Sequence, residues 1–269
     1  MSLKVVLAGC GNMGFAMLAG WLKAGSLKPS EVLVVEPNAE LRARAEKLGC
    51  AVGADASSLS GEPLLVVLAV KPQVIRDVTQ SYAALGNGST TFVSVAAGTP
   101  VSTFSEILGN KTPIIRVMPN TPAAIGKGMM VGFTNGHVKD TTRKFVEELL
   151  ATSGEVAFIE DEALMDAVTA VSGSGPAYIF HFIECLTAAG EKAGLPSETA
   201  KLLAMQTVYG AASLAAESDE EPATLRKQVT SPNGTTAAAL EVLMGGDRLK
   251  NLVTEAVEAA RLRSVELGK

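Results

Sequence analysis

A turn in the C-terminal half of the chain places two hydroxyl groups at the start of a helical pattern. Pro232, Asn233 and Gly234 lead into Thr235 and Thr236, and an alanine-rich segment with helical spacing follows. The first backbone N–H groups of a helix have no partner within the helix, and the helix dipole makes this end positive. The turn therefore predicts a site for a carboxylate or another small anion.

A second candidate ligand site is a glycine-rich loop near the N-terminus. Gly9, Gly11 and Gly14 fit the pattern G-x-G-x-x-G, with Asn12 and Met13 between the last two. The loop directly follows a predicted strand and begins a predicted helix. In this context the pattern is much more specific for dinucleotide binding than it is by itself. The three glycines then allow a tight turn, close approach of a pyrophosphate, and packing of the helix on the sheet. The loop predicts a bound dinucleotide; a structural turn without a ligand is the alternative.

Glu36 follows the second predicted strand, close to the offset of about 20 residues expected of an acidic residue that binds the adenosine ribose. A carboxylate there accepts hydrogen bonds from the ribose diol and repels the 2′-phosphate of NADP, so Glu36 by itself predicts NAD. If Pro37 directs Glu36 away, or if Arg42 or Arg44 reaches a phosphate, NADP stays open. A solvated glutamate in a turn is the alternative without a ligand.

Three further loops occupy equivalent places after predicted strands. They contain Ala69, Val70, Lys71 and Pro72 after the third strand, Ala96, Ala97 and Gly98 after the fourth, and Pro119, Asn120 and Thr121 after the fifth. Open α/β sheets bind ligands beyond the carboxyl ends of their strands, and small residues there let a nicotinamide ring lie close to the backbone. We expect Ala69 to Pro72, Ala96 and Ala97 to contact the cofactor, and Asn120 to contact the substrate. A solvated loop lysine is an equal alternative for Lys71.

The elements that must position these residues change in character near Glu160. Before it, apolar runs predict strands at 3–8, 31–35, 63–69, 91–95, 114–118, 129–133 and 155–159, with helices at 12–24 and 41–48. Continuous apolar strands separated by helices indicate a parallel sheet covered on both faces. Beyond Glu160, every apolar pattern has helical spacing. We therefore expect an α/β dinucleotide-binding domain over residues 1–160 and an all-helical domain over residues 161–269.

Composition narrows the class of function. The net charge of −5 argues against a nucleic-acid partner, and no apolar run approaches the ~20 residues that span a bilayer. The N-terminal segment lacks the length and the cationic flank of a signal peptide. The three cysteines are scattered, which predicts buried thiols in a reducing cytoplasm and no metal site. Neither His137 nor His181 lies in a candidate ligand loop, so no histidine catalyst is expected.

The segment from Ser172 to Pro176 interrupts a helical pattern with two glycines and a proline. Inside a helix these residue types cost about 1 and 3 kcal/mol relative to alanine. The segment predicts either a backbone that closely approaches a ligand, the first domain or another subunit, or an ordinary turn between helices.

Five segments together resemble the Δ1-pyrroline-5-carboxylate reductase family, which catalyses the last step of proline synthesis. They are GCGNMG, AVKPQ (69–73), RVMPNTPAAIGKG (116–128), DAVTAVSGSGPAYIF (166–180) and VTSPNGTTAAALEVL (229–243). The resemblance covers essentially the whole chain, and the last segment follows the family signature. It implies a Rossmann-like N-terminal domain, an all-α C-terminal dimerisation domain that interlocks with a partner, homodimers or decamers, and NADPH or NADH as cofactor.

The resemblance also implies roles for the C-terminal turn. The carboxylate-binding loop of the family maps onto Ser231, Asn233, Gly234, Thr235 and Thr236, with Thr236 in the place of the substrate-contacting threonine and as the expected catalytic residue. Two positions depart from the family. Many NADPH-preferring relatives carry Ser, Asn or Arg in place of Glu36, and an asparagine that contacts the adenosine ribose in some relatives is replaced near Ala56.

Hydride transfer without an acid–base residue suits a cyclic imine. A protonated imine is already electrophilic at carbon, so the enzyme chiefly binds, orients and excludes water. Thr236 is expected to orient the ring nitrogen or a water near it. Because the turn lies in the half expected to form the oligomer, we expect the active site to be completed near or across a subunit interface.

Two other functions stay open. One is a related reductase, such as a β-hydroxyacid dehydrogenase or an unrelated imine reductase. Those dehydrogenases use a lysine in the helical domain, whereas Lys192 and Lys201 lie in ordinary amphipathic patterns. The other is a non-enzymatic dinucleotide sensor, which would not need the anion-binding turn.

Overall fold

The computed structural model describes residues 3–268 and contains two compact units. The first comprises the chain up to Ser174 together with the residues from Ala260 onward, and the second is Gly175–Ala259. The units differ from the expected boundary between residues 160 and 161, because residues 161–174 and the C-terminal turn pack with the first unit. As a boundary between functional domains, 160/161 stays a prediction.

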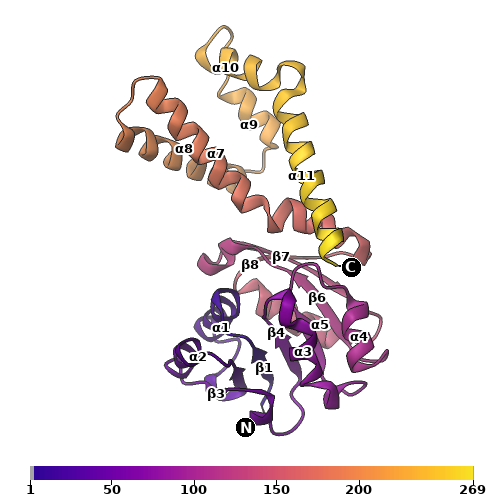
Figure 1. Ribbon diagram of the computed structural model, residues 1–269. Coiled ribbons are helices and arrows are strands. Elements are labelled where there is room, and N and C mark those ends of the chain that lie inside the picture. Colours follow the sequence, from indigo (N-terminus) through magenta and orange to yellow (C-terminus); the bar gives the residue numbers. More distant parts are fainter. Residues whose placement is uncertain (1–2, 269) are drawn as a thin grey trace. The chain divides into compact units, whose positions relative to one another are not determined.

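Eight strands form a single sheet in the first unit (Figure 1). In chain order they are β1 (Val5–Ala8), β2 (Val32–Val35), β3 (Ala51–Gly53), β4 (Leu65–Leu68), β5 (Thr91–Ser94), β6 (Ile114–Met118), β7 (Gly128–Thr134) and β8 (Gly154–Phe158). Their order across the sheet is β3-β2-β1-β4-β5-β6-β7-β8. The first six positions have the strand order of a doubly wound dinucleotide-binding fold, which confirms the Rossmann-like prediction.

The sheet departs from the prediction in two respects. It is not wholly parallel, because β7 runs antiparallel to β6 while β8 is parallel to β7. Apolar periodicity reports which face of a strand is buried and carries no information on its direction. The strand β3 was also not predicted; it has three residues, is partly exposed, and is held by parallel pairing with β2.

Helices cover both faces of this sheet. They are α1 (Asn12–Ala24), α2 (Ala39–Glu46), α3 (Ile75–Gln80), α4 (Val101–Leu108) and α5 (Asp140–Ala151), and the short helix α6 (Met165–Val168) follows β8 in the chain. Two local predictions are confirmed: Gly25 ends α1 in the left-handed conformation, and the Asn38 side chain caps α2 by accepting from the N–H groups of Glu40 and Leu41.

The hydrophobic core has two layers, one on each face of the sheet. Alternate strand residues such as Val5 and Val6 enter opposite layers, because successive side chains of a strand point to opposite faces. Trp21 of α1 is buried in one layer and Phe104 of α4 in the other. Burial on both faces explains why the central strands are continuously apolar.

The second unit is helical, as expected. The helices are α7 (Gly175–Lys192), α8 (Ser197–Glu217), α9 (Pro222–Gln228), α10 (Thr235–Met244) and α11 (Arg248–Leu267), whose last turns belong to the first unit. The helices α7 and α8 pack side by side (Figure 1). Within residues 175–259 only Ala200 and Ala204 are buried, whereas Phe180, Tyr209 and Leu252 are exposed. This unit leaves much of its apolar surface uncovered.

The segment from Ser172 to Pro176 lies at the junction between α6 and α7 and contains a bend at Ser174. A π-helical turn at Thr169–Gly173 joins α6 to α7. Pro176 is the second residue of α7, where a missing N–H costs nothing. A Cβ on Gly173 would collide with the Cε of Met118 at the end of β6. The close backbone approach is therefore present, and its partner is the sheet of the first unit.

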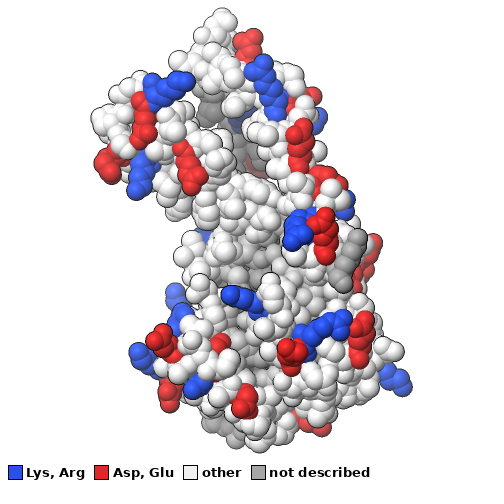
Figure 2. All heavy atoms as spheres, viewed as in Figure 1, with Lys and Arg blue, Asp and Glu red and all other residues white. Residues whose placement is uncertain are grey.

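Charged side chains of both signs are interspersed over the face shown in Figure 2, with uncharged areas between them. Within residues 3–268, no helix combines the length and the apolar character needed to cross a membrane.

Candidate active site

The glycine-rich loop has the geometry that a dinucleotide requires. Gly9 has a φ of +96°, and a Cβ there would meet the Ala69 carbonyl; a Cβ on Gly14 would collide with the carbonyl of Gly9. A Cβ on Gly11, in contrast, would meet nothing within 4 Å. Among the described residues, no side chain caps the first turn of α1. At Gly9 and Gly14, where the chain turns and the helix packs, there is no room for a side chain. At Gly11, where a pyrophosphate would lie, the space is empty, so these residues fit the cofactor.

Glu36 is buried beside this loop, at 7% exposure. Its Oε2 accepts from the backbone N–H of Cys10 at 2.8 Å, and its Oε1 accepts from the N–H of Asn38 at 2.9 Å. The alternative of a solvated turn glutamate is therefore wrong, and Pro37 does not turn the carboxylate away from the loop. The ribose role itself stays a prediction.

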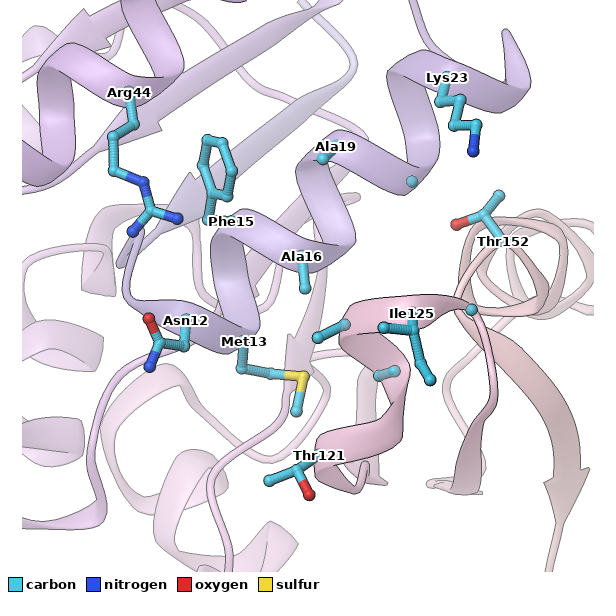
Figure 3. A pocket seen from close by; sticks show the side chains of 14 residues that line it. Asn12, Met13, Phe15, Ala16, Ala19, Lys23, Arg44, Thr121, Ile125 and Thr152 are labelled. Atoms are coloured by element: carbon cyan, nitrogen blue, oxygen red, sulfur yellow. The ribbon is translucent and has the colours of Figure 1, made fainter. Parts of the chain in front are cut away.

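The two nearby arginines are engaged by other groups. Arg42 donates through Nη1 to the carbonyl oxygens of Glu36 at 2.7 Å and Pro37 at 3.0 Å. The guanidinium of Arg44 lies over the ring of Phe15, 3.8 Å from its centroid (Figure 3). Burial raises the pKa of the Cys10 thiol to about 11, a shift that Arg44 opposes and Glu36 reinforces. The thiol inside the loop is therefore neutral at physiological pH.

The loops after β1, β4 and β5 lie side by side. The N–H of Ala69 donates to the carbonyl of Ala8 at 2.8 Å, and the N–H of Val95 donates to the carbonyl of Leu68 at 3.1 Å. Of the expected cofactor contacts in these loops, Ala96 is buried, Ala69, Val70 and Ala97 are half-buried, and Lys71 and Pro72 are exposed. The sheet therefore brings Gly9 to Gly14, Glu36, Ala69 to Pro72, Ala96 and Ala97 to one edge.

A cavity of about 610 Å³ lies beside the glycine loop, between α1 and the 3₁₀-helix Thr121–Ile125 (Figure 3). Asn12 and Met13 line one end, and Phe15, Ala16 and Ala19 continue along α1. Of the residues predicted to bind the cofactor, only Asn12 and Met13 line it, so the cavity follows α1 rather than the carboxyl ends of the strands.

Asn120 holds neighbouring backbone in place. Its Oδ1 accepts from the N–H of Met129 at 2.9 Å, and its Nδ2 donates to the carbonyl of Ser172 at 3.2 Å. The amide thus links the start of β7 to the π-helical turn. The expected substrate contact stays a prediction, and the structure adds a structural role that the sequence did not suggest.

In the second unit, the predicted anion turn precedes α10 as expected. Asn233 has a φ of +58°, Gly234 is the N-cap, and the N–H of Gly234 donates to the carbonyl of Ser231 at 3.1 Å. The first turn of α10 has no side-chain cap and no acidic residue among the described residues. Thr235 is exposed and Thr236 is half-buried. The N–H groups at this end therefore suit an anion.

The histidines, the cysteines and two partly buried polar pairs complete the account of candidate residues. His137 is exposed, and His181 and Cys185 are exposed on α7, so the prediction of buried thiols is wrong for Cys185 within this chain. No cluster suited to a metal ion occurs within the described residues. Sequence reasoning missed the pairs Arg116–Glu162 and Asp166–Ser264, which join residues 46 and 98 positions apart. No local pattern signals such long-range pairs.

Comparison with known proteins shows to which family the chain belongs. A family model described as pyrroline-5-carboxylate reductase dimerisation matches residues 162–267, and one described as NADP oxidoreductase, coenzyme F420-dependent, matches residues 4–98. Pyrroline-5-carboxylate reductase of Pseudomonas aeruginosa is 40% identical over 267 residues, covering 99% of this chain and 97% of that protein.

Solved structures agree. A pyrroline-5-carboxylate reductase from Coxiella burnetii superimposes with a TM-score of 0.93 at 35% identity, covering 99% of this chain and 98% of that one. The pyrroline carboxylate reductase of Plasmodium falciparum, with NADP bound, gives a TM-score of 0.85 at 31% identity, again covering 99% and 98%. With similarity of this degree along nearly its whole length, the chain belongs to the pyrroline-5-carboxylate reductase family.

Proposed function

We propose that this protein reduces 1-pyrroline-5-carboxylate to L-proline with a reduced nicotinamide dinucleotide. The observation that carries the proposal is the presence of two separate ligand sites on one chain. One is a glycine loop whose Gly11 is open to a pyrophosphate, and the other is the uncapped start of α10. The names of the full-length relatives agree with this reaction.

In this mechanism the residues of the chain bind and orient the substrate. The N–H groups around Gly234 and Thr235 hold the carboxylate, and the Thr236 hydroxyl orients the ring nitrogen or a water beside it. When bound, the reduced nicotinamide supplies the hydride that the imine carbon accepts. A protonated imine needs no further activation, which agrees with the absence of a histidine from the candidate loops.

We further propose that NADH is preferred over NADPH. Glu36 presents a buried carboxylate at the ribose end of the loop, and a 2′-phosphate beside it would meet like charge. One nitrogen of Arg42, Nη1, donates to two backbone carbonyls, which restrains its guanidinium beside Glu36.

The assembly and the compartment belong to the same proposal. The match to a dimerisation model and the exposed apolar side chains of α7, α8 and α11 support a homodimer, alone or as the unit of a decamer. The active site would then be completed near or across a subunit interface. A cytoplasmic location fits three free thiols and a biosynthetic reaction that consumes a reduced dinucleotide.

The test is a titration of the protein with NADH and with NADPH, each with and without 1-pyrroline-5-carboxylate, following the absorbance of the reduced nicotinamide. Oxidation of the cofactor that depends on this substrate, with proline as product, is expected. Cofactor binding without turnover would instead indicate a sensor. Turnover only with other imines or carbonyl compounds would indicate a related reductase.

A further inference from the structure

The loop between β5 and α4, residues 95–100, is held largely by distant parts of the chain. It contains Ala96 and Ala97, which are expected to contact the nicotinamide, and Gly98, whose φ is +71°. The N–H of Ala96 donates to the Oγ of Ser94, the last residue of β5, at 3.3 Å, and the N–H of Val95 donates to the carbonyl of Leu68 at 3.1 Å. The position of the loop therefore depends on contacts from outside it.

Glu162 provides the first of these contacts. Its Oε1 accepts from the N–H of Val101 at 2.8 Å and from Nη1 of Arg116 at 2.9 Å. The helix α4 has no side-chain cap from its own N-cap residue, Pro100. Glu162, 61 positions away, thus caps α4 and fixes the end of the loop. The side chain of Arg116 is 8% exposed and that of Glu162 is 26% exposed, so solvent screens the pair only weakly.

The C-terminal turn of α11 provides the second contact. Ser264 is buried, and its Oγ donates to Oδ1 of Asp166 at 2.6 Å. A Cβ on Gly98 would lie 3.5 Å from the Cβ of Leu267, and a Cβ on Gly268 would lie 2.8 Å from the carbonyl oxygen of Gly98. The end of α11 therefore packs directly against the middle of the loop.

Both contacts converge on one short segment. Glu162 and Asp166 are four positions apart in a continuous helical stretch, the 3₁₀-helix Glu162–Leu164 followed by α6, so they project from one face. One carboxylate holds the end of the loop, and the other holds the C-terminal turn that packs on its middle. Removal of either carboxylate is expected to let the loop shift while the sheet below it stays intact.

We propose that Glu162 is a positioning residue of the cofactor site: with the Asp166–Ser264 bond, it sets the position of the loop against the nicotinamide half of the dinucleotide. Glu162 acts through Val101 and Arg116 and does not itself contact the cofactor. The inference rests on the proposed function, because Ala96 and Ala97 are expected to contact the cofactor of that reaction beside its nicotinamide ring. The proposal predicts that substitution of Glu162 weakens binding of the nicotinamide half of the dinucleotide and leaves binding of the adenosine half unchanged.

The experiment compares Glu162→Gln with the unmodified protein in binding NADH and ADP-ribose, which lacks the nicotinamide. The amide keeps the size of the side chain and loses the charge that Arg116 and the start of α4 require. The dissociation constant for NADH should rise about tenfold, while that for ADP-ribose should stay unchanged. Glu160→Gln, an exposed change two residues earlier, is the matched control and should alter neither constant.

Ser264→Ala is a second, independent variant that tests the same proposal if Glu162→Gln does not fold. It removes the bond to Asp166 and should weaken NADH binding in the same selective way, to a smaller degree. Equal loss of NADH and ADP-ribose binding in the folded variants, or no loss of either, would overturn the positioning role. An unmodified protein that binds neither NADH nor NADPH would instead overturn the proposed function.

Discussion

Glu36 holds the backbone around the glycine-rich loop and is the residue that we propose to bind the ribose of the cofactor. Its two oxygens accept from the N–H groups of Cys10 and Asn38, which ties the end of β2 to the glycine loop. A carboxylate oxygen has more than one acceptor site, so a ribose hydroxyl can bind alongside these backbone donors. A carboxylate at this place would oppose a 2′-phosphate.

Replacing Glu36 with serine should therefore change the choice of cofactor. The unmodified protein is expected to have the higher kcat/KM with NADH, and Glu36→Ser should reduce that advantage about tenfold or more, because like charges no longer meet. Steady-state kinetics with both cofactors measures the effect, and Glu40→Ser on the exposed surface of α2 is the control. A strong preference of the unmodified protein for NADPH would contradict the assignment.

Tyr82 offers a test of stability at the same scale. The residue is 2% exposed, and its hydroxyl is buried without a hydrogen-bond partner among the described residues. Burial, with a smaller contribution from Asp55, raises its pKa to about 12, so the hydroxyl stays neutral at working pH. Tyr82→Phe should be neutral or should raise the free energy of unfolding by up to about 1 kcal/mol, because an unsatisfied polar group is removed.

Urea denaturation of both proteins near pH 7 measures the difference. Thr141→Val, which removes an exposed hydroxyl from α5 in the first unit, is the control and should leave stability nearly unchanged. A loss of more than about 1 kcal/mol in Tyr82→Phe would mean that the hydroxyl has a partner after all.

At the scale of elements, the glycines of the turn between β1 and α1 have different surroundings. A Cβ on Gly14 would collide with the Gly9 carbonyl, whereas one on Gly11 would meet open space at an ordinary φ of −64°. Gly14→Ala should therefore lower the melting temperature. Gly11→Ala should keep it and weaken binding of NADH, because the new methyl group occupies the space expected for the pyrophosphate.

Thermal denaturation and NADH titration of the two variants give the measurement, with Gly136→Ala in an exposed turn as control. Unchanged NADH affinity in Gly11→Ala would show that the pyrophosphate does not lie at this turn.

The same elements show what could be predicted from the sequence. The strands and the first two helices were found because burial on both faces, the cap at Asn38 and the stop at Gly25 are local signals. The direction of β7 and the short strand β3 depend on pairing with neighbours, which a single segment does not encode. The π-helical turn was not predicted, because the contact of Gly173 with Met118, 55 positions earlier in the chain, depends on the fold.

The candidate site was predicted to a similar extent. The glycine loop and the turn before α10 follow local rules and are found with the expected backbone geometry. Glu162, Arg116 and Ser264 were missed because their function depends on partners brought together only by the fold.

At the scale of the whole molecule, the second unit predicts assembly. Its helices expose large apolar side chains, including Phe180 at 58% and Leu252 at 64%, and a surface of this kind is stable in water only when covered. Sedimentation should show a dimer or a larger oligomer at micromolar concentration. Phe180→Asp should shift the protein toward smaller species, whereas the exposed control Lys192→Glu on the same helix should not. A monomeric unmodified protein would contradict this expectation.

The central claim is that the glycine loop and the anion-binding turn together serve a carboxylated cyclic imine. The most direct measurement compares kcat/KM for 1-pyrroline-5-carboxylate with that for 1-pyrroline, which has the same ring without the carboxylate, using NADH. We predict L-proline as the product of 1-pyrroline-5-carboxylate. We also predict a kcat/KM about a hundredfold or more higher for this imine than for 1-pyrroline, because 1-pyrroline has no carboxylate to bind at the start of α10. Equal turnover of the two imines, or no turnover of either, would contradict the account.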